Sequence, residues 1–143
     1  MVRPITVEDI KLFLNDFPEA NLLTRESEFS MERIQKARQY VLDEWNETSP
    51  NTNVYTVETF PYRNMMLYGI AAWLFLGQAT HQARNHLTYQ SGGLAISDDE
   101  NAQAYLNFYN VFNGIFKQRL ACKKMEENMN HGWGTEHSDY YGY

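Results

Sequence analysis

Four histidines are the residues of this sequence best suited to bind a metal ion or to transfer protons. His81 and His86 are five residues apart, so they do not share a helix face as residues four apart would. Neither they nor His131 and His137 belong to a cysteine pair, a His-Glu-x-x-His pattern or an acidic calcium loop. We therefore expect ordinary polar histidines and no metal site.

The remaining candidates for chemistry have simpler structural explanations. Cys122 has only Lys123 and Lys124 nearby to activate its thiol, which favours a structural, buried or half-buried cysteine. The run 91–93, Ser-Gly-Gly, is too short for a phosphate loop and has no lysine after it. The acidic run 98–100 fits the first turn of a helix. No set of residues here establishes a catalytic chemistry, and we expect no catalytic residue and no cofactor.

Composition excludes several other classes of protein. The chain has 143 residues, which suits one domain with a core of its own, and 43% of them are hydrophobic, too many for a disordered protein. A single cysteine excludes an internal disulfide framework. A formal charge of −6 argues against a broad basic face for nucleic acid. The N-terminus lacks the organisation of a signal peptide, and we expect a soluble protein of a reducing compartment.

Apolar spacing and helix caps predict an all-α domain over residues 1–130, resembling a four-helix bundle. A threonine cap at Thr6 opens a helix at about 6–15, and Ser30 caps a second helix that ends before the polar loop 46–53. The third helix is predicted from 59–61 to about residue 86, and the fourth from residue 98 or 99 to about 128. The run 54–57 has strand composition but is short.

The third helix is predicted to be the centre of the bundle. Between Met65 and Leu76 it is apolar on every side, so we expect it to be covered on every side, Trp73 included. These 12 residues are too few to span a bilayer, which needs about 20. Residues 51–97 carry one acid and two bases, which also indicates a segment surrounded by protein.

The fourth helix carries more apolar surface than one intramolecular contact needs. One stripe consists of Tyr105, Tyr109, Phe112, Phe116 and Leu120, and an adjoining stripe of Phe108, Val111, Ile115 and Cys122. Surplus apolar surface usually marks contact with another protein. Gly114, inside this helix, suggests close packing or a bend.

A modest basic patch lies late in the fourth helix. It consists of Lys117, Arg119, Lys123 and Lys124. These cations could complement the helix dipole, contact DNA phosphate or pair with an acidic neighbouring subunit, and for Lys117 and Arg119 a simple solvated face also fits and is favoured.

Two segments without a helical pattern complete the chain. Residues 87–96 contain two short alternating runs around the Ser-Gly-Gly turn, which predicts a β-hairpin supported by packing against other elements. Residues 131–143 contain one tryptophan and three tyrosines, and we expect an extended tail whose aromatic rings anchor it to a partner.

Two N-terminal helices, a long apolar helix and a hairpin entering a long last helix resemble the head-to-tail connector proteins of tailed bacteriophages, the adaptor rings beneath the portal. The run 84–93 (Arg-Asn-His-Leu-Thr-Tyr-Gln-Ser-Gly-Gly), Asp98-Asp99 and the region 105–109 carry the resemblance. They are similar to neck proteins of large podovirus-like phages, the crAss-like group included.

The resemblance implies a non-enzymatic ring subunit of the virion neck, made in the bacterial cytoplasm and usually present in twelve copies. Its partners would be further copies, the portal protein and other neck or tail proteins. DNA would pass through the acidic lumen without specific binding, and no membrane is involved. The implied partner-binding residues lie in the hairpin and the tail: Tyr89, Gly92, Gly93, Leu94, Ile96, Trp133, Tyr140, Tyr141 and Tyr143.

Three other functions fit the same residues. A stopper or tail-hub ring of the same particle would have the same sequence features. A small all-α regulatory protein would instead act as a dimer. An enzyme with an unrecognised polar pocket is the third.

Overall fold

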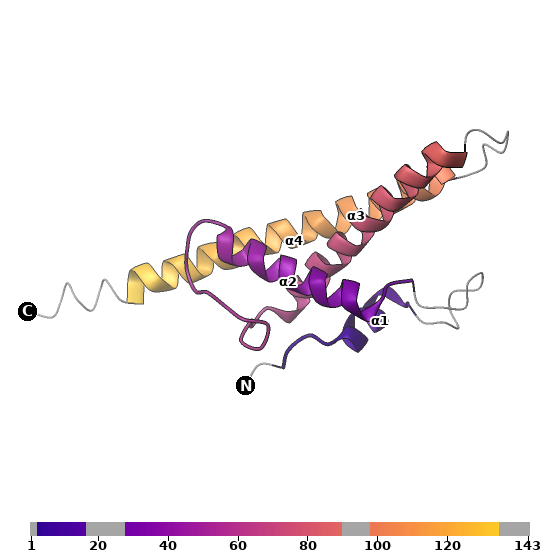
Figure 1. Ribbon diagram of the computed structural model, residues 1–143. Coiled ribbons are helices and arrows are strands. Elements are labelled where there is room, and N and C mark those ends of the chain that lie inside the picture. Colours follow the sequence, from indigo (N-terminus) through magenta and orange to yellow (C-terminus); the bar gives the residue numbers. More distant parts are fainter. Residues whose placement is uncertain (1–2, 17–27, 90–97, 135–143) are drawn as a thin grey trace, which may run out of the picture.

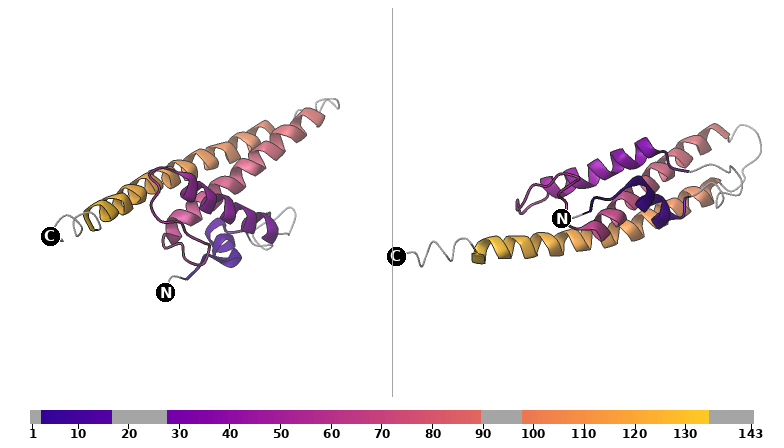
Figure 2. Two further views of the ribbon diagram at one scale, coloured as in Figure 1. Left: turned by 60° about the vertical axis from the view of Figure 1, so that its left-hand side comes forward. Right: turned by 90° about the horizontal axis from the view of Figure 1, so that it is seen from below.

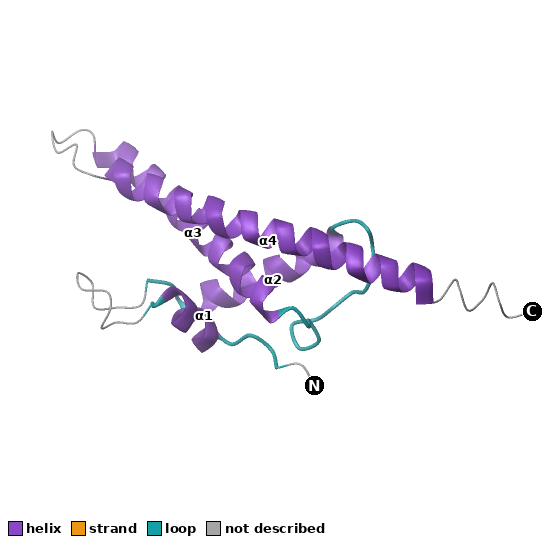
Figure 3. Ribbon diagram, turned by 180° about the vertical axis from the view of Figure 1, so that it is seen from behind, coloured by secondary structure: helices purple, strands orange, loops and turns teal. Residues whose placement is uncertain are grey.

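A computed structural model describes residues 3–16, 28–89 and 98–134. These residues form four helices and contain no strand, which confirms the all-α class (Figures 1 and 3). The helices are α1 (Val7–Leu14), α2 (Met31–Glu47), α3 (Arg63–Tyr89) and α4 (Asp98–Gly134).

The first two helices begin where their caps predict. The Thr6 hydroxyl accepts a hydrogen bond from the Asp9 amide at 3.2 Å, and the Asp9 carboxylate accepts one from the Thr6 amide at 3.0 Å. This reciprocal pair is a capping box. The Ser30 hydroxyl caps α2 by accepting from the Arg33 amide at 3.2 Å.

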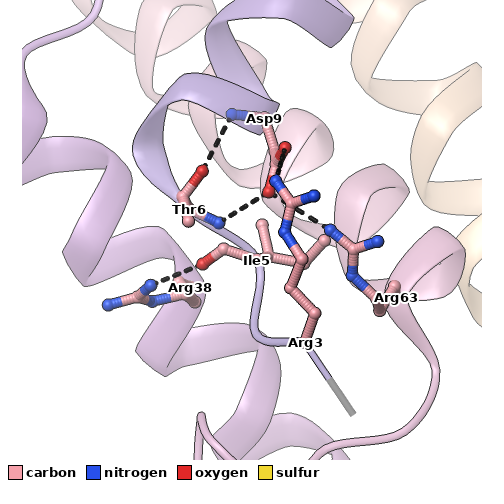
Figure 4. A network of polar contacts seen from close by, with 6 residues as sticks. All are labelled: Arg3, Ile5, Thr6, Asp9, Arg38 and Arg63. Carbon is pink, nitrogen blue, oxygen red and sulfur yellow. Dashed lines mark hydrogen bonds and ion pairs between the residues drawn. The ribbon is translucent and has the colours of Figure 1, made fainter.

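The N-terminal segment is fastened to the helices through Asp9 (Figure 4). Its carboxylate pairs with Arg3 and with Arg63 at the start of α3, at 3.3 and 3.2 Å. The amide of Thr6, followed by that residue's hydroxyl and the two arginines, lowers the pKa of Asp9 against the opposing effect of burial. On the other side of the segment, Arg38 of α2 donates to the Ile5 carbonyl at 2.6 Å.

The helices α3 and α4 run antiparallel, side by side, while α1 and α2 pack near the first half of α3 (Figures 1 and 2). A core is formed where the elements meet. It consists of Ile5, Ile10, Phe29, Ile34, Ala37, Val41, Leu42, Trp45, Phe60, Met65, Met66, Ile70, Leu74, Phe116 and Leu120. The tip of the α3–α4 pair projects beyond α1 and α2, so the molecule is elongated (Figure 2).

Three helices approach one another closely at Gly69. A Cβ atom there would lie 2.9 Å from the Phe116 ring of α4 and 2.9 Å from a methyl group of Val41 in α2. Only a residue without a side chain fits between two buried neighbours at that distance. Gly114 is different, because its Cβ would meet nothing within 4 Å. Of the two alternatives predicted for Gly114, close packing or a bend, close packing is therefore wrong.

Asp16 joins two parts of the chain that are distant in sequence. Its buried carboxylate accepts hydrogen bonds from the Glu28 amide at 2.6 Å and the Phe29 amide at 2.9 Å. The chain thus leaves α1 and returns toward α2 at one point. Residues 17–27 lie outside the described residues.

The predicted hairpin over 87–96 is not confirmed. Residues 87–89 form the last turn of α3, because no glycine or proline interrupts the helix before Gly92, and 90–97 lie outside the described residues. The run 54–57 is not a strand. The predicted tail begins later than residue 131, since α4 continues to Gly134, and residues 135–143 are not described.

The expectation that α3 is covered on every side is also wrong. Met66, Ile70 and Ala71 are fully buried, but 39% of the Trp73 surface is exposed. Trp73 packs on Tyr40 of α2 with a ring-centroid distance of 5.2 Å, and 49% of Tyr40 is exposed as well. An apolar ring is thus left at the surface on each of two neighbouring helices.

Candidate interaction surfaces

The last third of α4 carries a buried lysine. Lys124 is only 2% exposed, and its ammonium group lies 4.4 Å from the centre of the Trp45 ring. A cation over an indole face is attracted by the ring quadrupole, which offsets part of the cost of removing the charge from water. Burial still lowers the pKa of Lys124, although the nearby Glu127 carboxylate opposes this shift.

Glu127 is buried beside Lys124 and accepts three hydroxyl hydrogen bonds from the loop before α3. Tyr62 donates at 2.9 Å, Thr52 at 2.7 Å, and Tyr55 also donates. Burial alone would raise the pKa of Glu127, but these hydrogen bonds outweigh it and lower that pKa. Burial and the same carboxylate raise the pKa of Tyr62.

The contacts of Lys124 and Glu127 have a structural role, which is to attach the loop before α3 to α4. Every Glu127 contact named above comes from residues 52–62, and the Lys124 charge faces a tryptophan of α2. The sequence analysis groups Lys124 with a basic patch and does not single out Glu127. The sequence does contain a pattern that predicts the burial of both residues, because Leu120, Lys124 and Glu127 continue the buried stripe at steps of four and three.

A line of exposed apolar residues follows the opposite side of α4. We call it the α4 seam, and it consists of Phe108, Val111, Ile115, Gln118, Cys122, Met125 and Met129. Its members alternate at steps of three and four, the spacing with which helices pair in coiled coils. Only Gln118 is polar.

Most of the α4 seam points away from α3, although Phe108 at its start packs on Phe75 of α3 with a ring-centroid distance of 5.2 Å. Phe116 packs against α3 at Gly69, and Met125 follows it by two and a half turns at 3.6 residues a turn. Val111 is 60% exposed and Met125 63% exposed. The second apolar stripe predicted for this helix is thus largely uncovered, and Cys122 within it is exposed rather than buried.

A basic groove lies next to the seam, between the start of α3 and α4. Its cavity volume is about 720 Å³. The residues that line it are Pro61, Tyr62, Arg63, Asn64, Met65, Gln118, Arg119, Cys122 and Lys123. Three of these are cations and none is acidic.

The groove cations have different surroundings. Arg63 pairs with Asp9, and Lys123 pairs with Glu126 of its own helix at 3.0 Å. Arg119 is exposed and stacks 5.0 Å from the centre of the Tyr68 ring. The free N–H groups of the first turn of α3, which starts at Arg63, add positive potential.

An acidic flank lies on the other side of the molecule, along α2. It is defined by Tyr40, Asp43, Glu47 and Trp73, which line a cavity of about 420 Å³ together with Glu44 and Thr48. Asp43 and Glu47 are exposed, while Glu44 pairs with Lys117 of α4.

The same surface becomes basic toward the start of α2. A second cavity there, of about 450 Å³, is lined by Arg33, Lys36 and Arg84 together with the two exposed rings, Tyr40 and Trp73. Negative and positive charge therefore lie at opposite ends of one aromatic surface.

The predicted partner residues are only partly placed. Tyr89 is the last residue of α3 and Trp133 lies in the last turn of α4, near opposite ends of that helix. The other predicted contacts, Gly92, Gly93, Leu94, Ile96, Tyr140, Tyr141 and Tyr143, lie outside the described residues. His81 lines the basic end of the aromatic surface.

Two further findings concern the described ranges alone. Among residues 3–16, 28–89 and 98–134, no group of three or more histidine, cysteine or acidic side chains could hold a metal ion. None of the helices in those ranges combines the length and the hydropathy needed to span a bilayer.

Comparison with known proteins found no matching family model, no similar curated protein and no similar solved structure.

Proposed function

We propose that this chain is a non-enzymatic structural subunit that assembles with copies of itself into a ring, the head-to-tail connector of a tailed bacteriophage virion. In that role the ring binds the portal protein on one side and neck or tail proteins on the other. DNA passes through its lumen without specific binding, and the net charge of −6 favours a channel that repels phosphate.

The observation that carries the proposal is the exposed α4 seam. A single helix places six apolar side chains in one line, and most of them are exposed and lie away from its own core, although Phe108 also packs on Phe75 of α3. Soluble proteins rarely leave such a surface uncovered, and the steps of three and four suit a helix of another protein chain. When the chain assembles with copies of itself, the apolar surface of one copy is covered by another copy.

Charge substitutions in the seam test the proposal. We expect wild-type protein to form a closed oligomer in native mass spectrometry, and a Val111→Asp, Met125→Asp variant to remain monomeric. Both side chains are exposed, so the circular dichroism of the monomer should stay helical. Val54, 82% exposed in the loop before α3, provides the control Val54→Asp, which should assemble normally. Assembly of the seam variant at wild-type strength would overturn the proposal.

The heptad-like spacing of the seam also favours a second candidate, a dimeric all-α regulatory protein. Two seams packed against each other would form a symmetric helix pair. The mass of the oligomer separates the candidates, because a connector forms a ring of many copies and a regulator stops at two. Negative-stain images of the purified protein, and assembly with a portal protein encoded beside its gene, would identify the connector.

A further inference from the structure

The two charged surfaces of this chain lie on opposite sides of α4. Lys117 pairs with Glu44 of α2 and so marks the side of the acidic flank. Arg119 follows Lys117 by two residues, which in an α-helix is just over half a turn, and it lines the basic groove. The groove and the flank can therefore be occupied at the same time by two different molecules.

The two surfaces are complementary in charge and in chemistry. The groove offers the exposed Arg119 and the partly exposed Lys123, whereas the flank offers the exposed carboxylates of Asp43 and Glu47. Beside the carboxylates stand the half-exposed rings of Tyr40 and Trp73, and beside the groove cations stands the apolar α4 seam. The groove thus combines cations with an apolar strip, and the flank combines carboxylates with aromatic rings.

From this arrangement we infer that copies of the chain join head to tail, the basic groove of one copy receiving the acidic flank of the next. The inference rests on the proposed self-assembly and specifies its contact. Because the contact uses two different surfaces, it leaves one of each free at every step, and such a chain of contacts closes into a ring or grows as a filament.

The cations at the basic end of the aromatic surface, beyond the acidic flank, determine how two copies are oriented at the contact. Arg33, Lys36 and Arg84 lie at the basic end of the aromatic surface and would repel Arg119 and Lys123 of a neighbour. Only the end bearing Asp43 and Glu47 attracts them. Repulsion at one end and attraction at the other select one register for the contact.

Charge reversal on each surface provides the test, with oligomer mass measured by analytical ultracentrifugation. The groove variant is Arg119→Glu, Lys123→Glu, and the flank variant is Asp43→Lys, Glu47→Lys. Arg63 and Glu44 are left unchanged because they pair with Asp9 and Lys117. We expect each variant alone to sediment as a monomer, because like charges then face each other.

Mixing the two variants is the decisive step. In a 1:1 mixture, the unaltered flank of one variant meets the unaltered groove of the other, and the two reversed surfaces also attract each other. We expect the mixture to recover oligomers of wild-type mass, and a chain that carries all four substitutions to assemble by itself.

Matched controls change the same net charge elsewhere. Glu8→Lys with Glu58→Lys changes the net charge as the flank variant does, and Lys11→Glu with Gln35→Glu and Gln103→Glu changes it as the groove variant does. None of these residues lines the groove or the aromatic surface. Both control variants should assemble as wild type does.

Several outcomes would overturn the inference. If wild-type protein assembles and either reversed variant still assembles, the contact does not use these charges, as for a symmetric seam dimer or a groove that binds another anionic partner. If both variants are monomeric and the mixture stays monomeric, the two surfaces do not meet. A wild-type protein that is monomeric at every concentration would overturn the proposed function itself.

Discussion

Single charged residues in this protein have roles that depend on what covers them. Lys123 and Lys124 are neighbours in sequence, yet the first lines the groove and the second is buried against the Trp45 ring. A buried charge is costly unless hydrogen bonds or an aromatic face compensate it. The cluster of Lys124 and Glu127 therefore stabilises the fold only while its partners stay in place.

The hydrogen bonds to Glu127 predict a pH dependence of stability. Its pKa in the folded protein lies below the ordinary value of 4.5, so the stabilisation is complete above 4.5 and is lost as the pH falls through the lowered value. The unfolded chain binds more protons in that range, which is why stability decreases with acidification. Glu127→Gln should remove this contribution.

Urea unfolding of wild type and Glu127→Gln, measured from neutral to acidic pH, checks the expectation. The difference in unfolding free energy between the two proteins should shrink below pH 4.5. Asp9 has a lowered pKa in both proteins and cancels in this comparison. A difference that does not change with pH would show that the hydroxyl hydrogen bonds do not hold the carboxylate charged.

At the scale of the elements, sequence reasoning located the helices but not the contacts between them. Thr6 and Ser30 predict the starts of α1 and α2 because a cap acts through its own neighbours. The burial of Trp45 follows from its stripe. Local patterns do not show which side of α3 its neighbours leave open, and this is why Trp73 was wrongly expected to be buried.

The groove and the flank were beyond sequence reasoning for a related reason. Arg63 and Arg119 are far apart in the chain, and only the antiparallel pairing of α3 with α4 brings them to one cavity. The seam is different, because all of its residues share one helix. The steps of three and four along the helix predict the surplus of apolar surface. The full length of the seam becomes clear only from the structure, in which α4 continues past Asn128.

The two helical glycines give an opposite pair of stability predictions. Gly69→Ala should destabilise the protein, because overpacking against Phe116 and Val41 costs about 1–3 kcal/mol and exceeds the gain in helix propensity. Gly114→Ala should stabilise it by about 1 kcal/mol, because nothing crowds the added methyl group.

Chemical denaturation of both glycine variants, at a concentration where the protein is monomeric, measures the two changes. Equal stabilisation by both alanines would mean that α3 can shift away from its neighbours at no cost, and that Gly69 does not set the distance between the helices.

For the whole molecule, the elongated α3–α4 pair places the core and the projecting tip at different positions along its length. The core and the fastened loop lie around the first half of α3 and the middle and last thirds of α4, whereas the tip of the pair projects beyond α1 and α2 (Figure 2). In the ring that we propose, a subunit of this shape would contact its neighbours along the body and present its two ends to other proteins of the particle.

Removal of residues 131–143 tests the role of the C-terminal end. The buried cluster ends at Glu127, so the truncated protein should keep its melting temperature within a few degrees, the shift expected for under about 1 kcal/mol. Incorporation into particles should weaken, which co-sedimentation with portal-containing particles measures. Undiminished incorporation would show that this end takes no part in docking.

The clasp that Asp16 forms with the amides of Glu28 and Phe29 has a practical consequence. Since Asp16 and Glu28 are held together, lengthening the chain between them adds little closure entropy, about 0.6 kcal/mol for each doubling of the number of residues. A peptide epitope or a small fluorescent module spliced there should leave the helices undisturbed. It would report, in electron micrographs of an assembled particle, where each copy places its amino-terminal half.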